Sequence, residues 1–380
     1  MDLICFCHIR WNFVYQRPQH LMERFAKHNR VFFLEEPVFD QSGKPFMEVN
    51  KDGPNLWIIT PHLIHGYSLD ENVFQQKILL SSFYNEYVIK NYTHWYYTPM
   101  ALIISNHLQP EMIIYDCMDE LSNFNFAPPE LKQREKELFR VADLVFTGGH
   151  NLYKAKKNAH NNIFPFPSSI DKDHFEKARS IRKEPADQAK ISHPIFGFYG
   201  VVDERFDIDI LREIATRRPQ WSFVIIGPVI KIDPATLPQL ANIHYLGARN
   251  YEVLPYYLSG WDIAMIPFLL NDSTKYISPT KTPEYLAAGV PVISSSIVDV
   301  VNPYAINNLI HIADDVEAFI NEAEKELAVT DKKSWLARVD FFLKENSWDQ
   351  TWREMMQHIN ATLKNKRGSS ITTKKEDAYV

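Results

Sequence analysis

Short apolar segments alternate with amphipathic segments along most of this chain, and the alternation restarts after a charged stretch near its middle. Short apolar runs between loops are typical of buried strands, and the longer amphipathic stretches that separate them are typical of helices. Strands that are separated by helices pair mostly in parallel, in sheets with helices on both faces. The pattern therefore predicts an α/β protein.

The alternation predicts two domains, and a length of 380 residues also favours two cores over one. In the first domain, residues 1–170, we expect strands at 3–8, 31–35, 56–60, 112–115 and 144–147 and helices at 17–28, 70–91 and 130–141, with 102–104 as either. The charged stretch 171–193 is interpreted as a linker. In the second domain, residues 194–344, we expect strands at 195–199, 222–226, 243–246 and 263–266 and helices at 207–217 and 251–258. A helical region follows at 331–365, and the polar residues 366–380 are expected to be disordered.

Composition excludes some classes of function. A net charge of −6 and a pI near 6.2 argue against a nucleic-acid partner held by bulk electrostatics. The three cysteines show no spacing typical of a zinc site, and an odd number without secretory features fits a reducing cytoplasm. The chain opens without a basic signal-peptide region, and apolar runs such as 263–270 are too short to span a bilayer. We expect a cytoplasmic protein, and peripheral contact with the inner face of the membrane stays open.

Residues 278–295, Ser-Pro-Thr-Lys-Thr-Pro-Glu-Tyr-Leu-Ala-Ala-Gly-Val-Pro-Val-Ile-Ser-Ser, carry the most specific local pattern. Thr282 and Pro283 predict an N-cap and a first-turn proline, so a helix is expected to begin there. Lys281, beside the free N–H groups of that helix start, indicates an anionic ligand, typically phosphate. Glu284 is placed to accept hydrogen bonds from sugar hydroxyls. The alternative is an ordinary helix–strand unit with a good cap.

This segment resembles the donor-site motif of GT-B glycosyltransferases, especially the GT4-like group, in which a glutamate precedes an Ala-Gly-Pro-Val stretch. The resemblance implies two Rossmann-like domains with parallel sheets that face a central cleft: an acceptor domain first, a nucleotide-sugar donor domain second, and a helix at about 345–365 that crosses back onto the first. By position, Glu284 is then the ribose ligand and Lys281 a phosphate ligand, with Thr280 and Thr282 beside them on the donor side. The family's second glutamate, eight residues before Glu284, is Tyr276 here, so the role of that position toward the donor is open.

Two further segments of the second domain resemble the same family. The stretch Phe-Tyr-Gly-Val-Val-Asp-Glu-Arg at 198–205 is similar to its strand–glycine–basic stretch: Gly200 matches the glycine, and Arg205 falls near the position of a phosphate-binding lysine. Arg205 and Lys281 would then give two cations for a diphosphate without a metal. Gly227 lies in a segment that resembles the turn beside the nucleotide site. Asp207-Ile208-Asp209 matches a metal-binding pattern of the other large glycosyltransferase fold but is interpreted as a helix start.

In the first domain, the loop after the first strand ends in Arg17-Pro18-Gln19-His20-Leu21 and has no glycine, where the family usually has a Gly-rich turn. Ligands bind at this edge in open α/β sheets. Arg17 is the candidate for holding an anionic group, and His8 or His20 for proton transfer. The alternative for each histidine is a surface or purely structural place.

Asp116 and Asp119 follow a predicted strand at the same edge, where the family often has a catalytic-site histidine. A carboxylate near the reacting anomeric carbon can accept the acceptor's hydroxyl proton or stabilise oxocarbenium charge. Asp116 is the catalytic candidate, and Asp119 is a candidate on the acceptor side. The structural alternative is that Asp119 caps the next helix and Asp116 binds loop amides.

The resemblance implies a glycosyltransferase that moves a sugar from a nucleotide-diphosphate-sugar donor to a hydroxyl acceptor, with retention and without a metal or other cofactor. The acceptor would be a saccharide or a lipid-linked saccharide, as in polysaccharide biosynthesis. One alternative is a GT-B nucleotide-sugar 2-epimerase. Another, motivated by Tyr276 and the glycine-free first loop, is a non-catalytic nucleotide-sugar-binding partner of another transferase.

Overall fold

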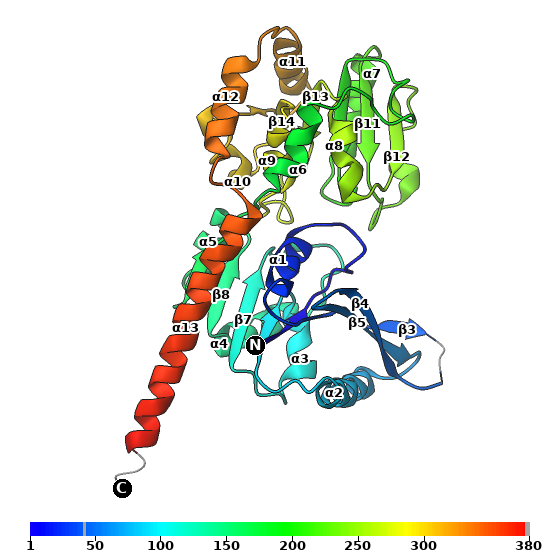
Figure 1. Cartoon of the computed structure of the whole chain (residues 1–380). Helices are drawn as coiled ribbons and strands as arrows, with labels where there is room; N and C mark the ends of the chain where they lie inside the picture. The colour runs from blue at the N-terminus through cyan, green and yellow to red at the C-terminus, as the bar shows by residue number, and fades with distance from the viewer. Residues whose placement is uncertain (41–42, 377–380) are drawn as a thin grey trace.

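Two α/β domains, each built around its own sheet, make up the chain (Figure 1). The structure is a computed structural model and describes residues 1–40 and 43–376, with side chains described through Gly368. Sequence patterning predicted the alternation of strands and helices in both domains, and the α/β class with two parallel sheets is confirmed. Short 3₁₀ turns complement the regular elements at Pro99–Ala101, Leu121–Asn123, Lys177–Arg179, Pro234–Thr236, Tyr251–Val253 and Ala305–Asn307.

The first domain contains a nine-stranded sheet in the order β3-β5-β2-β1-β6-β7-β8-β9, in which β4 pairs with β5. All pairs are parallel except β4 with β5. The strands are β1 (Asp2–Phe6), β2 (Val31–Leu34), β3 (Val38–Asp40), β4 (Phe46–Gly53), β5 (Leu56–Ile64), β6 (Tyr92–Tyr96), β7 (Met112–Cys117), β8 (Leu144–Thr147) and β9 (Ile163–Pro165). The helices are α1 (Arg17–Ala26), α2 (Leu69–Glu86), α3 (Leu102–Ser105), α4 (Leu131–Val141) and α5 (His150–Lys156).

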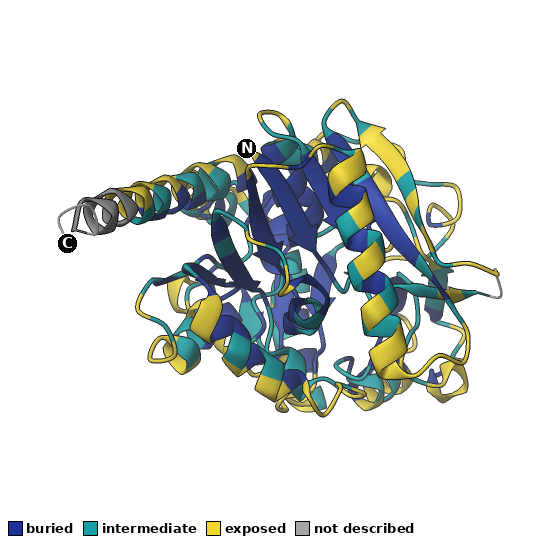
Figure 2. Cartoon of the chain, turned by 90° about the horizontal axis from the view of Figure 1, so that it is seen from below, coloured by how far each residue is buried: buried dark blue, intermediate teal, exposed yellow. Residues whose placement is uncertain are grey.

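The central strands of this sheet are buried on both faces (Figure 2). In β1, Leu3 and Cys5 belong to one apolar cluster, which also includes Leu21 of α1, whereas Ile4 and Phe6 belong to another. Successive side chains of a strand point to opposite faces of the sheet, so one short apolar run contributes side chains to two apolar clusters. This is why the run is continuously apolar and does not alternate with polar residues.

The second domain has a six-stranded, fully parallel sheet in the order β12-β11-β10-β13-β14-β15. The strands are β10 (Ile195–Tyr199), β11 (Ser222–Ile226), β12 (Ile243–Gly247), β13 (Ile263–Ile266), β14 (Val292–Ser294) and β15 (His311–Ile312). The helices are α6 (Lys172–Glu176), α7 (Ile208–Arg217), α8 (Leu254–Leu258), α9 (Lys281–Ala287), α10 (Val298–Val301), α11 (Val316–Leu327) and α12 (Lys333–Phe342).

The charged stretch 171–193, which the sequence predicted as a linker, packs onto the second domain. Phe175 belongs to the core of that domain. Gln188 is fully buried, where it donates to the carbonyl of Tyr257 at 2.8 Å and accepts from the indole N–H of Trp261 at 2.9 Å. A few buried anchors therefore fix a stretch whose composition is otherwise that of a loop.

Helix α13 (Trp348–Glu376) returns from the second domain to the first, where it packs beside α1 and β8 (Figure 1). Trp348 and Met355 are fully buried in the first domain's core. The helix continues past residue 365, where a disordered tail was predicted. Lys366 pairs with Asp143 of the first domain at 2.7 Å, and residues 377–380 of the predicted tail lie outside the described residues. Within the part of the chain that the structure describes, no helix combines the length and apolar character needed to cross a membrane.

Candidate active site

A cavity of about 540 Å³ lies between the two domains. Its walls come mainly from the loops that follow β1, β7, β8 and β9 in the first domain and β10, β11, β12 and β13 in the second. Glu23 of α1 and Asp52 of β4 complete the first-domain side. These loops leave the carboxyl ends of parallel strands, which is where ligands bind in open α/β sheets. The edge that the sequence analysis selected therefore faces this cavity in both domains.

Lys281 lies at the first position of α9 and lines the cavity. The helix begins earlier than predicted: Thr280, without a side-chain hydrogen bond, is the N-cap, and Thr282 lies inside the first turn. The Lys281 ammonium lies 5.4 Å from the ring centre of Phe198 and 5.7 Å from that of Phe268. Among the residues that the structure describes, it has no hydrogen-bond or ion-pair partner.

A second cation, Arg205, lines the cavity near Lys281. Its guanidinium donates to Asp203 at 2.6 and 2.9 Å, which fixes its orientation. Burial and the positive charge of Arg205 lower the pKa of Lys281 well below that of an ordinary lysine. Two cations that repel one another in a partly dehydrated cavity favour an anionic ligand.

Glu284, one turn further along α9, is buried and also lines the cavity. The Tyr199 hydroxyl donates a short hydrogen bond to its Oε2. Burial raises the pKa of Glu284, while this hydrogen bond and the charge of Lys281 oppose the rise. Sequence analysis missed Tyr199, although its place directly before Gly200, at the end of β10, was a usable signal.

Gly200 and Gly227, two donor-side candidates, bring the backbone close to the cavity. Both have positive φ, +134° and +142°, and both line the cavity. A Cβ on Gly227 would lie 1.9 Å from the carbonyl oxygen of Gly200. The neighbouring wall continues through Ile226, Pro228 and Ala248, which form a mainly apolar surface.

Of the three remaining donor-side candidates, only one lines the cavity. Thr280 lines the cavity, but Thr282 does not: it is fully buried, and its hydroxyl has no partner among the described residues. Tyr276 also lies outside the cavity lining and packs against an apolar cluster of the first domain. The structure therefore places Thr282 in the buried first turn of α9 and Tyr276 at a contact between the domains.

On the first-domain side, Asp119 lines the cavity after β7. Burial raises its pKa to about 6, against the opposing effect of Arg205 and Arg17. Asp116, the predicted catalytic carboxylate, does not line the cavity: it is fully buried and forms a salt bridge with Arg17 at 2.8 Å. Arg17 itself is 4% exposed and touches the cavity, but its charge is already balanced.

The two candidate histidines lie away from the cavity lining. His20 is buried on α1, where its ring stacks on Trp348 at 4.7 Å and meets the edge of Tyr15 at 4.5 Å. Burial lowers the pKa of His20 well below the ordinary range and that of His8 to about 4. Burial thus favours the neutral form of both rings, and their place outside the cavity lining fits the structural alternative.

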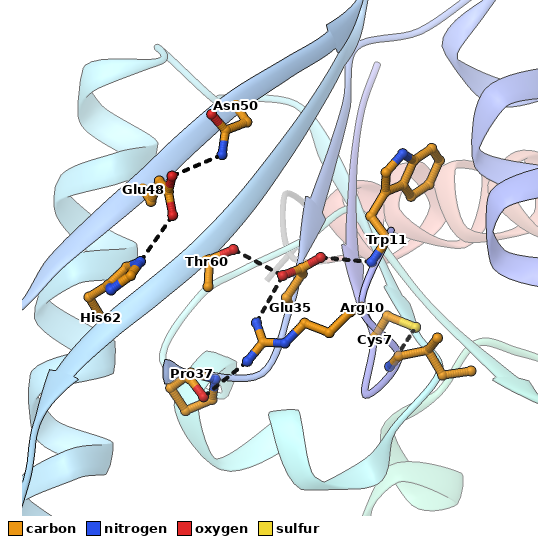
Figure 3. A network of polar contacts seen from close by, with 10 residues as sticks. Cys7, Arg10, Trp11, Glu35, Pro37, Glu48, Asn50, Thr60 and His62 are labelled. Carbon is orange, nitrogen blue, oxygen red and sulfur yellow. Dashed lines mark hydrogen bonds and ion pairs between the residues drawn. The ribbon is translucent and has the colours of Figure 1, made fainter. Parts of the chain in front are cut away.

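The glycine-free first loop is held in place by Glu35, which follows β2 (Figure 3). The Glu35 carboxylate accepts the Trp11 backbone N–H at 2.7 Å, the Thr60 hydroxyl at 2.9 Å and the Arg10 guanidinium at 2.8 Å. Residues 11–17 of the loop line the cavity. A buried carboxylate thus fixes this wall without a glycine turn, and the sequence pattern did not reveal it.

The Asp-X-Asp pattern serves the helix start, as the sequence analysis interpreted it. Asp207 is the N-cap of α7 and accepts the N–H of Ile210 at 2.9 Å, and Asp209 pairs with Arg212. No group of three or more His, Cys, Asp or Glu side chains that could hold a metal ion was found in residues 1–40 and 43–376.

Comparison with known proteins gives one family match, one relative by sequence and two similar structures. Residues 194–328 match the family described as Glycosyl transferases group 1. The chain is 22% identical over 286 residues to the proposed teichuronic acid biosynthesis glycosyltransferase TuaH of Bacillus subtilis (strain 168), with 70% of each protein covered. Its fold is similar to that of sucrose-phosphate synthase from Thermosynechococcus elongatus, with a TM-score of 0.70, 15% identity and coverage of 95% of this chain and 98% of that one. It is also similar to a trehalose-6-phosphate protein from E. coli bound with UDP-2-fluoro glucose, with a TM-score of 0.68, 13% identity and coverage of 96% and 99%.

Proposed function

We propose that the chain is a GT-B glycosyltransferase, as the match of residues 194–328 to Glycosyl transferases group 1 supports, and that it moves a sugar from a nucleotide-diphosphate-sugar donor to a hydroxyl group of a saccharide. The observation that carries this proposal is the pair of cations in the cavity. Lys281 has no ionic partner among the described residues, and Arg205 lies near it on the same wall. A diphosphate would balance the charge of Lys281 and accept from the guanidinium of Arg205, whose own charge Asp203 already balances. A fold relative binds a UDP-sugar analogue.

The donor would lie along the second-domain wall. The close backbone approach at Gly200 and Gly227 leaves room for the diphosphate and the nucleoside, and Glu284 would accept hydrogen bonds from ribose hydroxyls. Tyr199 keeps the Glu284 carboxylate oriented. These residues would hold the nucleotide in a fixed pose before the acceptor enters, which lowers the entropic part of the barrier.

In the transfer step, the bond between the anomeric carbon and the diphosphate oxygen breaks, and a bond to the acceptor oxygen forms. Lys281 and Arg205 would stabilise the charge that develops on the departing diphosphate, without a requirement for a metal. The acceptor's hydroxyl proton would leave toward Asp119 or the departing diphosphate oxygen. Asp119 lines the cavity and carries a carboxylate whose pKa, about 6, suits proton transfer near neutral pH. We further propose retention of anomeric configuration, on the family resemblance alone.

The biological product would be a polysaccharide or another glycan, as the name of the Bacillus subtilis relative supports. The acceptor would then be a saccharide or a lipid-linked saccharide. A lipid-linked acceptor would bring the protein into peripheral contact with the inner face of the membrane.

The donor site is tested by heat stabilisation of the purified protein with a panel of nucleoside diphosphates and nucleotide-sugars, with and without a chelator. A ligand that binds only the folded state at about 100 times its Kd adds about 2.7 kcal/mol. We expect one nucleoside series to raise the midpoint equally with and without chelator, and we expect Lys281→Met and Glu284→Ala to abolish the shift. Lys325→Met, which changes an exposed lysine of α11, is the matched control. No shift with any member would contradict the proposal.

Product analysis then separates the three functions. A transferase releases nucleoside diphosphate and a new glycoside only when an acceptor is present. An epimerase converts its substrate without an acceptor, and a non-catalytic partner binds the nucleotide without turnover.

A further inference from the structure

The two domains contribute different charged side chains to the cavity. The second-domain wall carries the cations Arg205, Arg249 and Lys281 together with the carboxylates of Glu252 and Glu284. The first-domain wall carries three carboxylates, those of Glu23, Asp52 and Asp119. Carboxylates therefore predominate on the acceptor side, whereas the donor side carries charges of both signs.

Arg17 also lines the first-domain wall, but its charge does not offset those of the three carboxylates. Arg17 is held by Asp116 through three contacts of 2.8 to 3.1 Å, and its remaining nitrogen donates to the Phe166 carbonyl at 2.7 Å. Arg10, on the same loop, is not part of the lining and pairs with Glu35. Neither guanidinium is available to an anionic group that enters from this side.

The first-domain carboxylates are fixed in place. The indole N–H of Trp11 donates to Asp52 at 2.8 Å, and the backbone N–H of Trp11 is held in turn by Glu35. The Tyr15 hydroxyl donates to Glu23 at 2.5 Å. The same wall includes Phe13, which is 41% exposed and offers an apolar ring face.

We propose that the part of the acceptor that enters this cavity is an uncharged sugar, and that the first-domain wall selects against sugars that carry a phosphate or a carboxylate. The inference rests on the proposed function. An anionic sugar would approach three carboxylates at close range, without a free cation on that wall to balance its charge. A neutral sugar meets no such penalty: its hydroxyls donate to Glu23 and Asp52, and its apolar face packs on Phe13.

The experiment compares pairs of acceptors that differ only in charge: a glycoside with its 6-phosphate, and a hexoside with the matching hexuronide. Each is tested with the donor identified by heat stabilisation, and product is measured by mass spectrometry. We expect kcat/KM to favour the neutral member of each pair by about tenfold or more, the factor that about 1.4 kcal/mol supplies. The preference should weaken as salt rises, because salt screens charge.

Variants test whether the wall causes the preference. The double variant Glu23→Gln with Asp52→Asn removes two charges and keeps the side-chain shapes, so we expect the preference to shrink several-fold. Glu317→Gln, which changes an exposed carboxylate of α11, is the matched control and should leave the preference unchanged.

The outcomes separate this inference from the proposed function. If a nucleoside diphosphate stabilises the protein but the anionic sugars react equally well or better, or if no neutral sugar reacts, the acceptor inference is wrong and the donor site stands. An unchanged preference in the double variant also overturns it. If no nucleoside diphosphate binds, the proposed function fails, and the inference fails with it.

Discussion

The side chain of Lys281 crosses the backbone of Gly200 so closely that a Cβ atom on Gly200 would lie 2.3 Å from Lys281 Cε and 2.7 Å from its Nζ. Gly200 follows β10, and Lys281 begins α9, far along the sequence. The glycine thus provides the space through which the lysine reaches the cavity. Its positive φ of +134° is also a backbone conformation that residues with a Cβ rarely adopt.

Gly200→Ala should therefore weaken the binding of nucleoside diphosphate, because the methyl group displaces the Lys281 ammonium. We expect at least a tenfold loss in affinity, about 1.4 kcal/mol, measured by isothermal titration calorimetry. The strained backbone should also lower the free energy of unfolding by about 1–3 kcal/mol. Gly53→Ala is the control, because a Cβ atom on Gly53 would meet only the Cβ of Leu56, at an ordinary contact distance of 3.9 Å. Wild-type affinity in Gly200→Ala would show that the position of Lys281 does not matter for the nucleotide.

Tyr199→Phe removes the hydroxyl that donates to Glu284 and leaves that buried carboxylate without its partner. A buried acceptor that loses its hydrogen bond costs about 1–3 kcal/mol. We expect the pKa of Glu284 to rise further and the affinity for nucleoside diphosphate at pH 7 to fall, with partial recovery at higher pH as the carboxylate ionises. Titration calorimetry at several pH values measures this. A pH-independent loss of affinity would argue against a role for the charge of Glu284.

Asp119 gives the transfer reaction a predicted pH dependence. Its pKa is raised to about 6, so the carboxylate is ionised above that pH and becomes protonated as the pH falls through it. If ionised Asp119 is required, kcat/KM should fall in acid with a midpoint near 6. Asp119→Asn should lower kcat by roughly 10²–10⁴-fold, as loss of an acid–base group typically does, with little effect on the binding of nucleoside diphosphate. If kcat/KM of Asp119→Asn falls in acid with the same midpoint as in the wild type, the ionisation of another group causes that fall.

The fold was predictable because its strands are buried on both faces. Segments such as Ile195–Tyr199 and Ile263–Ile266 are continuously apolar. Because helices separate such strands along the chain, the pattern predicts a parallel sheet. The missed strand β6 has Thr93 and His94 among aromatic residues. The ring of His94 is satisfied by the hydroxyls of Tyr84 and Tyr96, and a local sequence pattern does not reveal these contacts.

The site was predictable where a single chain segment determines it. Lys281, Glu284, Gly200, Gly227 and Arg205 all lie in motifs with a recognisable resemblance, and all line one cavity. First-domain roles were harder to assign because they depend on which partner each charge meets. The sequence could not show that Arg17 and Asp116, which were predicted separately as site residues, bind one another in a buried salt bridge.

That pair, Asp116 and Arg17, gives a prediction about stability. Asp116→Asn would leave the guanidinium of Arg17 buried without a counter-charge, and breaking a buried ion pair in this way costs about 3–5 kcal/mol. We expect a large drop in the unfolding midpoint, with nucleoside diphosphate binding retained at low temperature because Asp116 does not line the cavity. Replacing both residues, as in Arg17→Met with Asp116→Leu, should recover much of the stability. A folded Asp116→Asn protein of unchanged stability that has lost turnover would instead support a catalytic role for Asp116.

A pH-dependent contribution to stability should come from His311 of β15, whose ring nitrogens contact Glu322 at 2.8 Å and Glu326 at 3.0 Å. The hydrogen bond with Glu326 is the largest cause of a raised pKa for His311. Because the folded-state pKa lies above the unfolded value of about 6.5, this stabilisation is fully present below about pH 6.5 and is lost as the pH rises through the folded-state pKa. His311→Gln should therefore lower the free energy of unfolding more at pH 6 than at pH 8.5. We expect a difference of about 0.5–1 kcal/mol for this partly exposed cluster. Calorimetry of both proteins at the two pH values measures the difference, with His65→Gln, in a loop of the first domain, as the control. An equal effect of His311→Gln at both pH values would mean that the ring contributes by packing and not by its charge.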